Sequence, residues 1–116
     1  MILDDIKNKL EEVDPQVDYG VVKRSRNETL WNYTVFNRNV MKPSQNKTSY
    51  SEHYSVHVVR ENFLPEGLVL EVIHKMLEIA GMRLAGTDIQ YTYTTKPNTD
   101  KVVEMASIEF VRPVKV

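Results

Sequence analysis

The sequence predicts one α+β domain over residues 1–116, a two-layer sandwich in which a four- to five-stranded, mostly antiparallel sheet carries two helices on one face. Three observations predict this fold class. The stretch Glu66 to Leu84 repeats apolar residues at the helical period, so one broad helix face must lie on another layer. The flanking segments alternate apolar and polar residues, as half-buried antiparallel strands do. The length of 116 residues suits a single core but not two domains.

A short helix is expected at the N-terminus, followed by a short strand. The helix has a narrow apolar stripe that can dock beside the longer helix: Ile2, Leu3, Ile6, Leu10 and Val13. Asp14-Pro15 ends it, because the residue before a proline is pushed out of the helical region. The segment Val17 to Val22 is then expected as a short strand, and Lys23 to Glu28 as a polar turn.

A long hairpin is expected next. Leu30 to Asn37 is rich in aromatic and β-branched residues and has large apolar groups on both faces. Tyr50 to Arg60 alternates strictly, with Tyr50, Tyr54, Val56 and Val58 on one face and Ser51, His53, Ser55 and His57 on the other. The polar segment between the strands, Asn39 to Ser49, is predicted to be a loop longer than an ordinary hairpin connection.

The main helix is expected to begin at Pro65 and to end at Gly81, which suit a first helical position and a helix end respectively. Its apolar face is expected to hold Val69, Val72, Ile73, Met76 and Ala80, widened by Leu68, Leu77 and Ile79. Its outer face is expected to be solvated and holds Glu71, His74, Lys75 and Glu78. Met82 to Leu84 is expected as the exit from the helix.

A second hairpin completes the predicted sheet. Asp88 to Thr95 alternates, Lys96 to Asp100 is a turn, and Lys101 to Val111 is the last strand. Glu104 stands among apolar neighbours on that strand, where we expect an ion pair at the strand end or at an interface.

The sequence shows no catalytic chemistry, and we expect no enzyme, no cofactor and no metal site. It has no cysteine, no glycine-rich phosphate loop and no nucleophile motif. His53 and His57 lie on one strand, where four residues span about 13 Å, too far for a single zinc ion. The N-terminus does not have the pattern of a secretory signal, and no segment approaches the roughly 20 apolar residues of a membrane span. We therefore expect a soluble protein made in the cytoplasm.

Charge is unevenly distributed although the net charge is only −1. Residues 1–19 carry six acids and two bases, and residues 20–51 carry six bases and one acid. The six bases, which are the candidate contact residues, are Lys23, Arg24, Arg26, Arg38, Lys42 and Lys47. Three interpretations are open. These residues contact the acidic N-terminal region of another copy head to tail, or they bind nucleic acid, or they form a solvated patch. Apolar groups on the sheet face without helices predict either a partner or a crowded sheet in a monomer.

Four segments carry a resemblance to a known family. They are LWNYTVFNRN, SYSEHYSVHVVRENFLPEG, GMRLA and DIQYTYTTKPNTDKVVEMASIEF. Together they resemble the small tail proteins of long-tailed bacteriophages and prophages, over about residues 1 to 113. The order of elements is similar to that of the lambda-type tail terminator, in which a sheet with two helices on one face assembles into a hexameric ring.

The resemblance implies a structural protein without catalytic residues. Such a ring caps the tail tube, stops its polymerisation and presents a surface to the head, so the implied partners are further copies of the chain, the tail tube and head-completion proteins. The resemblance is also compatible with a chain that is monomeric until assembly, and related neck and tail-completion proteins share the fold. The loop from Arg38 to Ser49 would reach a neighbour or the tube, or face DNA passing through the ring. The implied location is the host cytoplasm during assembly and then the virion tail.

Overall fold

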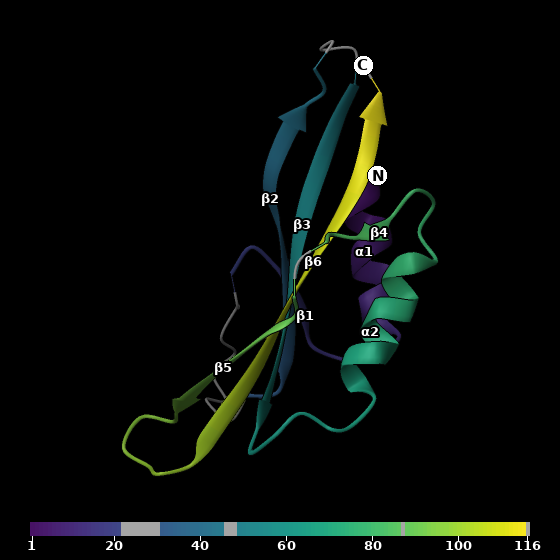
Figure 1. Ribbon diagram of the computed structural model, residues 1–116. Coiled ribbons are helices and arrows are strands. Elements are labelled where there is room, and N and C mark those ends of the chain that lie inside the picture. The colour runs from purple at the N-terminus through teal and green to yellow at the C-terminus, as the bar shows by residue number, and fades with distance from the viewer. Residues whose placement is uncertain (22–30, 46–48, 87, 116) are drawn as a thin grey trace.

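The computed structural model describes residues 1–21, 31–45, 49–86 and 88–115, without the side chain of the last of these. The elements run in the order α1 (Ile2–Glu11), β1 (Val17–Tyr19), β2 (Tyr33–Pro43), β3 (Ser49–Glu61), α2 (Leu68–Leu77), β4 (Arg83–Leu84), β5 (Gln90–Thr95) and β6 (Val102–Lys115) (Figure 1). Neither helix in this part of the chain is long and apolar enough to cross a membrane.

The six strands form one mixed sheet in the order β1-β2-β3-β6, with β4 and β5 both pairing with the outer edge of β6. All pairs are antiparallel except β1 with β2, which is parallel. The α+β class is therefore as predicted, while the strand count exceeds the predicted four to five. The additional strand is β4, only two residues long, in the segment that was expected to be a plain exit from the helix.

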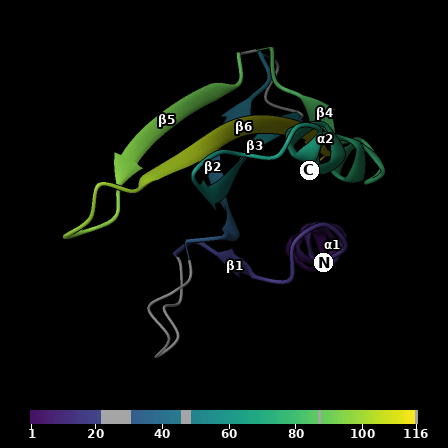
Figure 2. The same cartoon turned by 90° about the horizontal axis from the view of Figure 1, so that it is seen from below.

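Both helices lie on the same side of the twisted sheet, and the main core fills the space between the two layers (Figure 2). The core is built from the inward positions of the three long strands and from the apolar stripes of the helices: Ile6, Leu10, Phe36, Tyr54, Val56, Val58, Val72, Met76, Ile108 and Phe110. Each such side chain contributes about 1.5–3 kcal/mol relative to its exposed state. The alternation predicted for Tyr50 to Arg60 is confirmed, because Tyr54, Val56 and Val58 are buried on this face.

The predicted loop from Asn39 to Ser49 is wrong at both ends. Strand β2 continues to Pro43 and β3 begins at Ser49, with a register shift between Arg38 and Val40. The segment is polar and has weak strand propensity, but β3 offers it a continuous partner. Strand pairing of this kind routinely overrides local propensity.

The main helix is shorter than predicted at both ends. It begins at Leu68 because Gly67 has a left-handed backbone, with φ 89°, which breaks the helical path from Pro65. It ends at Leu77, and Gly81 closes the following turn with φ 80°. The predicted core positions Val69, Val72, Ile73, Met76 and Ile79 are buried. Ala80 and Leu77 are exposed instead: Ala80 lies beyond the end of α2, and Leu77 is its last residue, at the edge of the apolar stripe.

The outer face of α2, predicted to be solvated only, is tied to α1 by ion pairs. The Lys9 ammonium lies 2.7 Å from Glu78 Oε1, and the Lys75 ammonium lies 3.1 Å from Glu12 Oε1. In the first pair the lysine comes from α1 and the carboxylate follows α2, and in the second pair the lysine comes from α2 and the carboxylate follows α1. Both pairs are partly exposed, so they add modestly to the apolar packing that holds the helices over the sheet.

Candidate functional site

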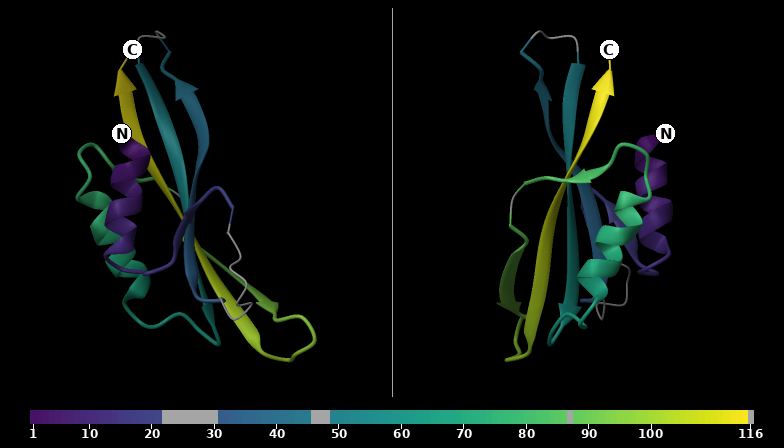
Figure 3. Two further views of the ribbon diagram at one scale, coloured as in Figure 1. Left: turned by 180° about the vertical axis from the view of Figure 1, so that it is seen from behind. Right: turned by 45° about the vertical axis from the view of Figure 1, so that its right-hand side comes forward.

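The sheet projects beyond both helices as an arm, formed by residues 40–43 of β2, 49–53 of β3 and 111–115 of β6 (Figures 1 and 3). The molecule is elongated, 52 × 26 × 23 Å, and the hairpin of β5 and β6 extends past the helices at the opposite end (Figure 1). Val40 and Met41, at the tip of β2, are 42% and 48% exposed. Exposed apolar side chains on a projecting strand are available for contact with another molecule.

Two of the six predicted contact residues lie in the described part of the chain, and both are on β2 rather than in a loop. Lys42 is exposed on the arm. Arg38 lies at the base of the arm, where its Nε donates a hydrogen bond to the Tyr19 hydroxyl at 3.1 Å. The Tyr19 ring in turn packs on Phe36, with 5.2 Å between ring centroids. Lys23, Arg24, Arg26 and Lys47 lie outside the described residues, as does the predicted turn from Lys23 to Glu28.

Much of the acidic N-terminal region has partners within the same chain. Asp14 is buried and contacts Arg60 at 2.9 Å. Glu12 contacts Lys75, and an oxygen of Asp18 accepts a hydrogen bond from the Gln16 amide. These internal contacts weaken the negative field that this region can offer to the basic segment of another copy.

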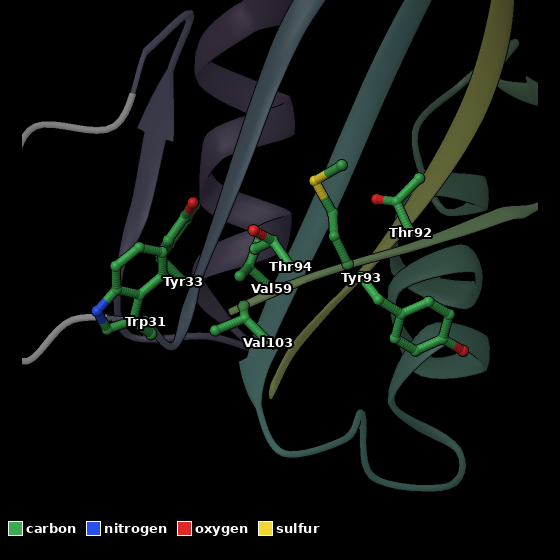
Figure 4. A pocket seen from close by; sticks show the side chains of 8 residues that line it. Trp31, Tyr33, Val59, Thr92, Tyr93, Thr94 and Val103 are labelled. Carbon is green, nitrogen blue, oxygen red and sulfur yellow. The ribbon is translucent and has the colours of Figure 1, made fainter. Parts of the chain in front are cut away.

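The sheet face without helices has an apolar hollow at the end opposite the arm (Figure 4). Its volume is about 200 Å³, and it is lined by Trp31, Tyr33, Val59, Thr92, Tyr93, Thr94, Val103 and Met105. Val59 and Val103 are 3% and 2% exposed although they do not belong to the main core. The ring of Tyr93 points away from Trp31 and Tyr33 (Figure 4). The apolar groups on both faces of the first and last long strands predicted such a surface, but not its position.

Closer to the arm, the same face is polar. Asn39 Nδ2 donates to Glu109 Oε1 at 2.9 Å, and His53 Nδ1 lies 3.8 Å from Glu109 Oε2. His57 Nδ1 lies 2.8 Å from the Ser107 hydroxyl oxygen, and burial lowers the pKa of this histidine. A serine nucleophile needs a histidine that a third group orients, but Glu109 contacts the other histidine. The described residues also contain no group of three side chains able to hold a metal ion.

Glu104 has a different role from the ion pair expected at its position. Its Oε1 accepts a hydrogen bond from the Leu64 backbone amide at 2.6 Å, which fixes the turn before α2. It also hydrogen-bonds the Tyr93 hydroxyl, which raises the pKa of that tyrosine. Arg60, its register partner on β3, is engaged with Asp14 instead. Glu104 is therefore a structural residue of the fold.

The sequence matches no protein-family model and no curated protein. Two surfaces of the described residues with potential for contact are the arm and the apolar hollow. Sequence reasoning placed Arg38 and Lys42 near the first of these but missed Val40 and Met41, whose apolar side chains within a polar segment were the available signal.

Proposed function

We propose that the protein is a structural assembly protein of the phage head–tail joint: a tail terminator that caps the tail tube as a hexameric ring and helps to join it to the head. The observation that carries this proposal is the arm, which extends past both helices and exposes Val40, Met41 and Lys42. Apolar side chains exposed on a projecting part of the sheet suit a subunit that must reach a neighbour.

The position of the apolar hollow supports a ring in particular. The arm and the hollow lie at opposite ends of the long axis and are different surfaces. A contact between the arm of one copy and the hollow of the next would be head-to-tail, and such contacts close into a ring when the rotation allows. Trp31 and Tyr33 are the aromatic side chains of the kind that anchor interfaces.

The mechanism is geometric and uses no catalytic residue. Once each arm has bound its neighbour, the closed ring presents no free arm and no free hollow to a further subunit of the tube. Polymerisation of the tube then stops at the ring. The basic residues Arg38 and Lys42 lie at the base and on the side of the arm, where they meet the neighbour or the DNA that passes through the ring.

Tail assembly without this protein tests the proposal. Cells that produce the other tail and head components are expected to yield tubes of irregular length that do not join heads. Supplying the chain should restore joining, and Met41→Glu on the arm should not. Glu71→Lys, an exposed change on α2, is the matched control and should restore joining fully. Tubes of normal length that join heads without the protein would contradict the proposal.

The alternative is a nucleic-acid-binding module that uses residues 23–47, and it predicts a monomer that binds DNA instead of a subunit that assembles with its own copies. It requires salt-sensitive binding to DNA by a monomer, because phosphate contacts release counterions. Lys42→Glu would then weaken DNA binding while leaving tail assembly unaffected.

A further inference from the structure

The free edges of the sheet differ in how they are protected against pairing with another strand. Natural edge strands carry bulges, lysines and prolines, because their unpaired N–H and C=O groups otherwise attract other strands. The outer edge of β2 has the register shift after Arg38 and ends in Lys42-Pro43. The outer edge of β6 beyond β4 carries Arg112 and Pro113. Both edges of the arm therefore carry features that hinder pairing with a further strand.

The outer edge of β5 has none of these features. Its six residues, Gln90–Thr95, have the sequence QYTYTT, with no charge and no proline, and all six are exposed. Their pairing with β6 runs without a register shift, and no described strand pairs with the other side of β5. Figures 2 and 3 show β5 at the margin of the described molecule. In an antiparallel pair every second residue directs its N–H and C=O away from its partner, so β5 offers a regular row of unpaired groups.

We propose that this edge pairs with β5 of a second copy, antiparallel and about a two-fold axis at Thr92, so that two sheets join into one. An axis perpendicular to the sheet keeps the helices of both copies on the same side. Thr92 then stands opposite the partner's Thr92, and Tyr91 stands opposite the partner's Tyr93. Gln90 stands opposite the partner's Thr94, on the same sheet face as Thr92.

The two tyrosines favour this register. They face the helix-bearing side, because their register partners on β6 are Ala106 and Glu104, and Ala106 belongs to the main core. Tyr91 is 49% and Tyr93 65% exposed, so both have surface left to bury. The axis at Thr92 creates two tyrosine–tyrosine cross-strand pairs, and aromatic pairs of this kind stabilise sheets.

A second copy suits this edge better than an unlike partner does. A two-fold contact uses the same patch twice, so any charge on the strand would meet the same charge across the axis. The sequence QYTYTT avoids this, since it carries none. The same pairing at the edge of the arm would gather Arg38 and Lys42 of both copies in one short region. The β5 contact is independent of the proposed ring: in a head-to-tail ring it would join two rings or pair free subunits.

Sedimentation equilibrium of the full chain tests the proposal. One strand pair covers less than the roughly 1,200–2,000 Å² of a stable interface, so we expect a weak dimer with Kd about 100 µM. Thr92→Lys places two like charges opposite each other at the axis and should raise Kd roughly tenfold or more. Thr92→Glu should do the same. An equimolar mixture of the two variants should dimerise at least as well as the wild type, because opposite charges then meet.

Gln90→Lys is the matched control, because Gln90 is exposed on the same strand and does not line the apolar hollow. Its lysine faces the partner's Thr94, so Kd should change no more than about threefold. Circular dichroism of each variant checks folding, and amide exchange supplies a second measurement: β5 amides should become more protected as the concentration of the wild type is raised. A wild type that remains monomeric at about 1 mM would overturn the proposal. The proposal would also be overturned if Thr92→Lys left the dimer Kd unchanged, or if mixing the Thr92→Lys and Thr92→Glu variants did not restore dimerisation.

Discussion

The carboxylate of Asp14 lies 2.9 Å from the Arg60 guanidinium, although the two residues come from different layers of the fold. Asp14 follows α1, whereas Arg60 lies near the end of β3. The same carboxylate oxygen accepts a hydrogen bond from the buried Thr34 hydroxyl on β2 at 2.8 Å, and the other oxygen accepts one from the backbone N–H of Gln16 at 3.0 Å. One buried acid therefore fixes the end of the first helix to two central strands.

Replacing Asp14 should be severely destabilising. Asp14→Ala leaves the Arg60 guanidinium, only 16% exposed, without its carboxylate, and breaking a buried pair in this way costs about 3–5 kcal/mol. Urea unfolding measures the loss in the free energy of unfolding. Asp88→Ala, an exposed change outside helices and strands, is the control and should stay within about 0.5 kcal/mol. Equal effects of the two variants would show that the buried pair is not stabilising.

The ion pair between the helices should make stability depend on pH in the acid range. The hydrogen bond from Lys9, with the nearby charge of Lys75, holds the pKa of Glu78 below its ordinary value of 4.5. The contribution of Glu78 is therefore present above pH 4.5 and is lost as the pH falls through the lower, folded-state value. Urea midpoints of the wild type should fall more steeply across this window than those of Glu78→Gln. In 1 M salt, where the Debye length is about 3 Å, the difference should shrink.

Two glycines that face open space should respond in opposite ways to alanine. No atom lies within 4 Å of a Cβ added at Gly67 or Gly86, so the backbone alone decides the effect. Gly67 has φ 89°, and a left-handed conformation costs a residue with a Cβ about 1–2 kcal/mol. Gly86 does not have a positive φ, and Gly86→Ala should raise the free energy of unfolding by up to about 1 kcal/mol. Thermal unfolding distinguishes them, and a loss of stability in Gly86→Ala would contradict the argument.

Burial of His57 should appear directly in its titration. Desolvation disfavours the charged imidazole and lowers the pKa of His57 below its ordinary value of 6.5. NMR should therefore find a midpoint below 6.5 in the folded protein. Because the unfolded chain binds this proton first, stability should decrease as the pH falls below 6.5. His57→Gln should flatten that part of the pH profile, and an unchanged profile would contradict the expected role of burial.

Periodicity by itself determined the class and the layers of this protein. The alternation of Tyr50 to Arg60 and the stripe from Val69 to Ile79 predict most of the buried residues of their elements, because the side chains of a strand or a helix return to the same face at a fixed period. The same patterns predict two helices on one sheet face and a sheet with apolar groups left on the other. These are local properties, and they depend on the order of residues within one element.

Only the tertiary structure decided how far each element runs and what its polar residues do. The segment from Asn39 to Pro43 becomes strand because β3 lies beside it, and Leu68 begins the main helix because Gly67 turns the chain. Glu104 and Asp14 fix turns to strands through partners 40 and 46 residues away (104 − 64 and 60 − 14), and the sequence did not indicate these partners. The outer side of β5 is a free edge because no described strand pairs with it. Pairing and hydrogen bonding between distant segments are set by the path of the whole chain, and a pattern within one segment carries no information about that path.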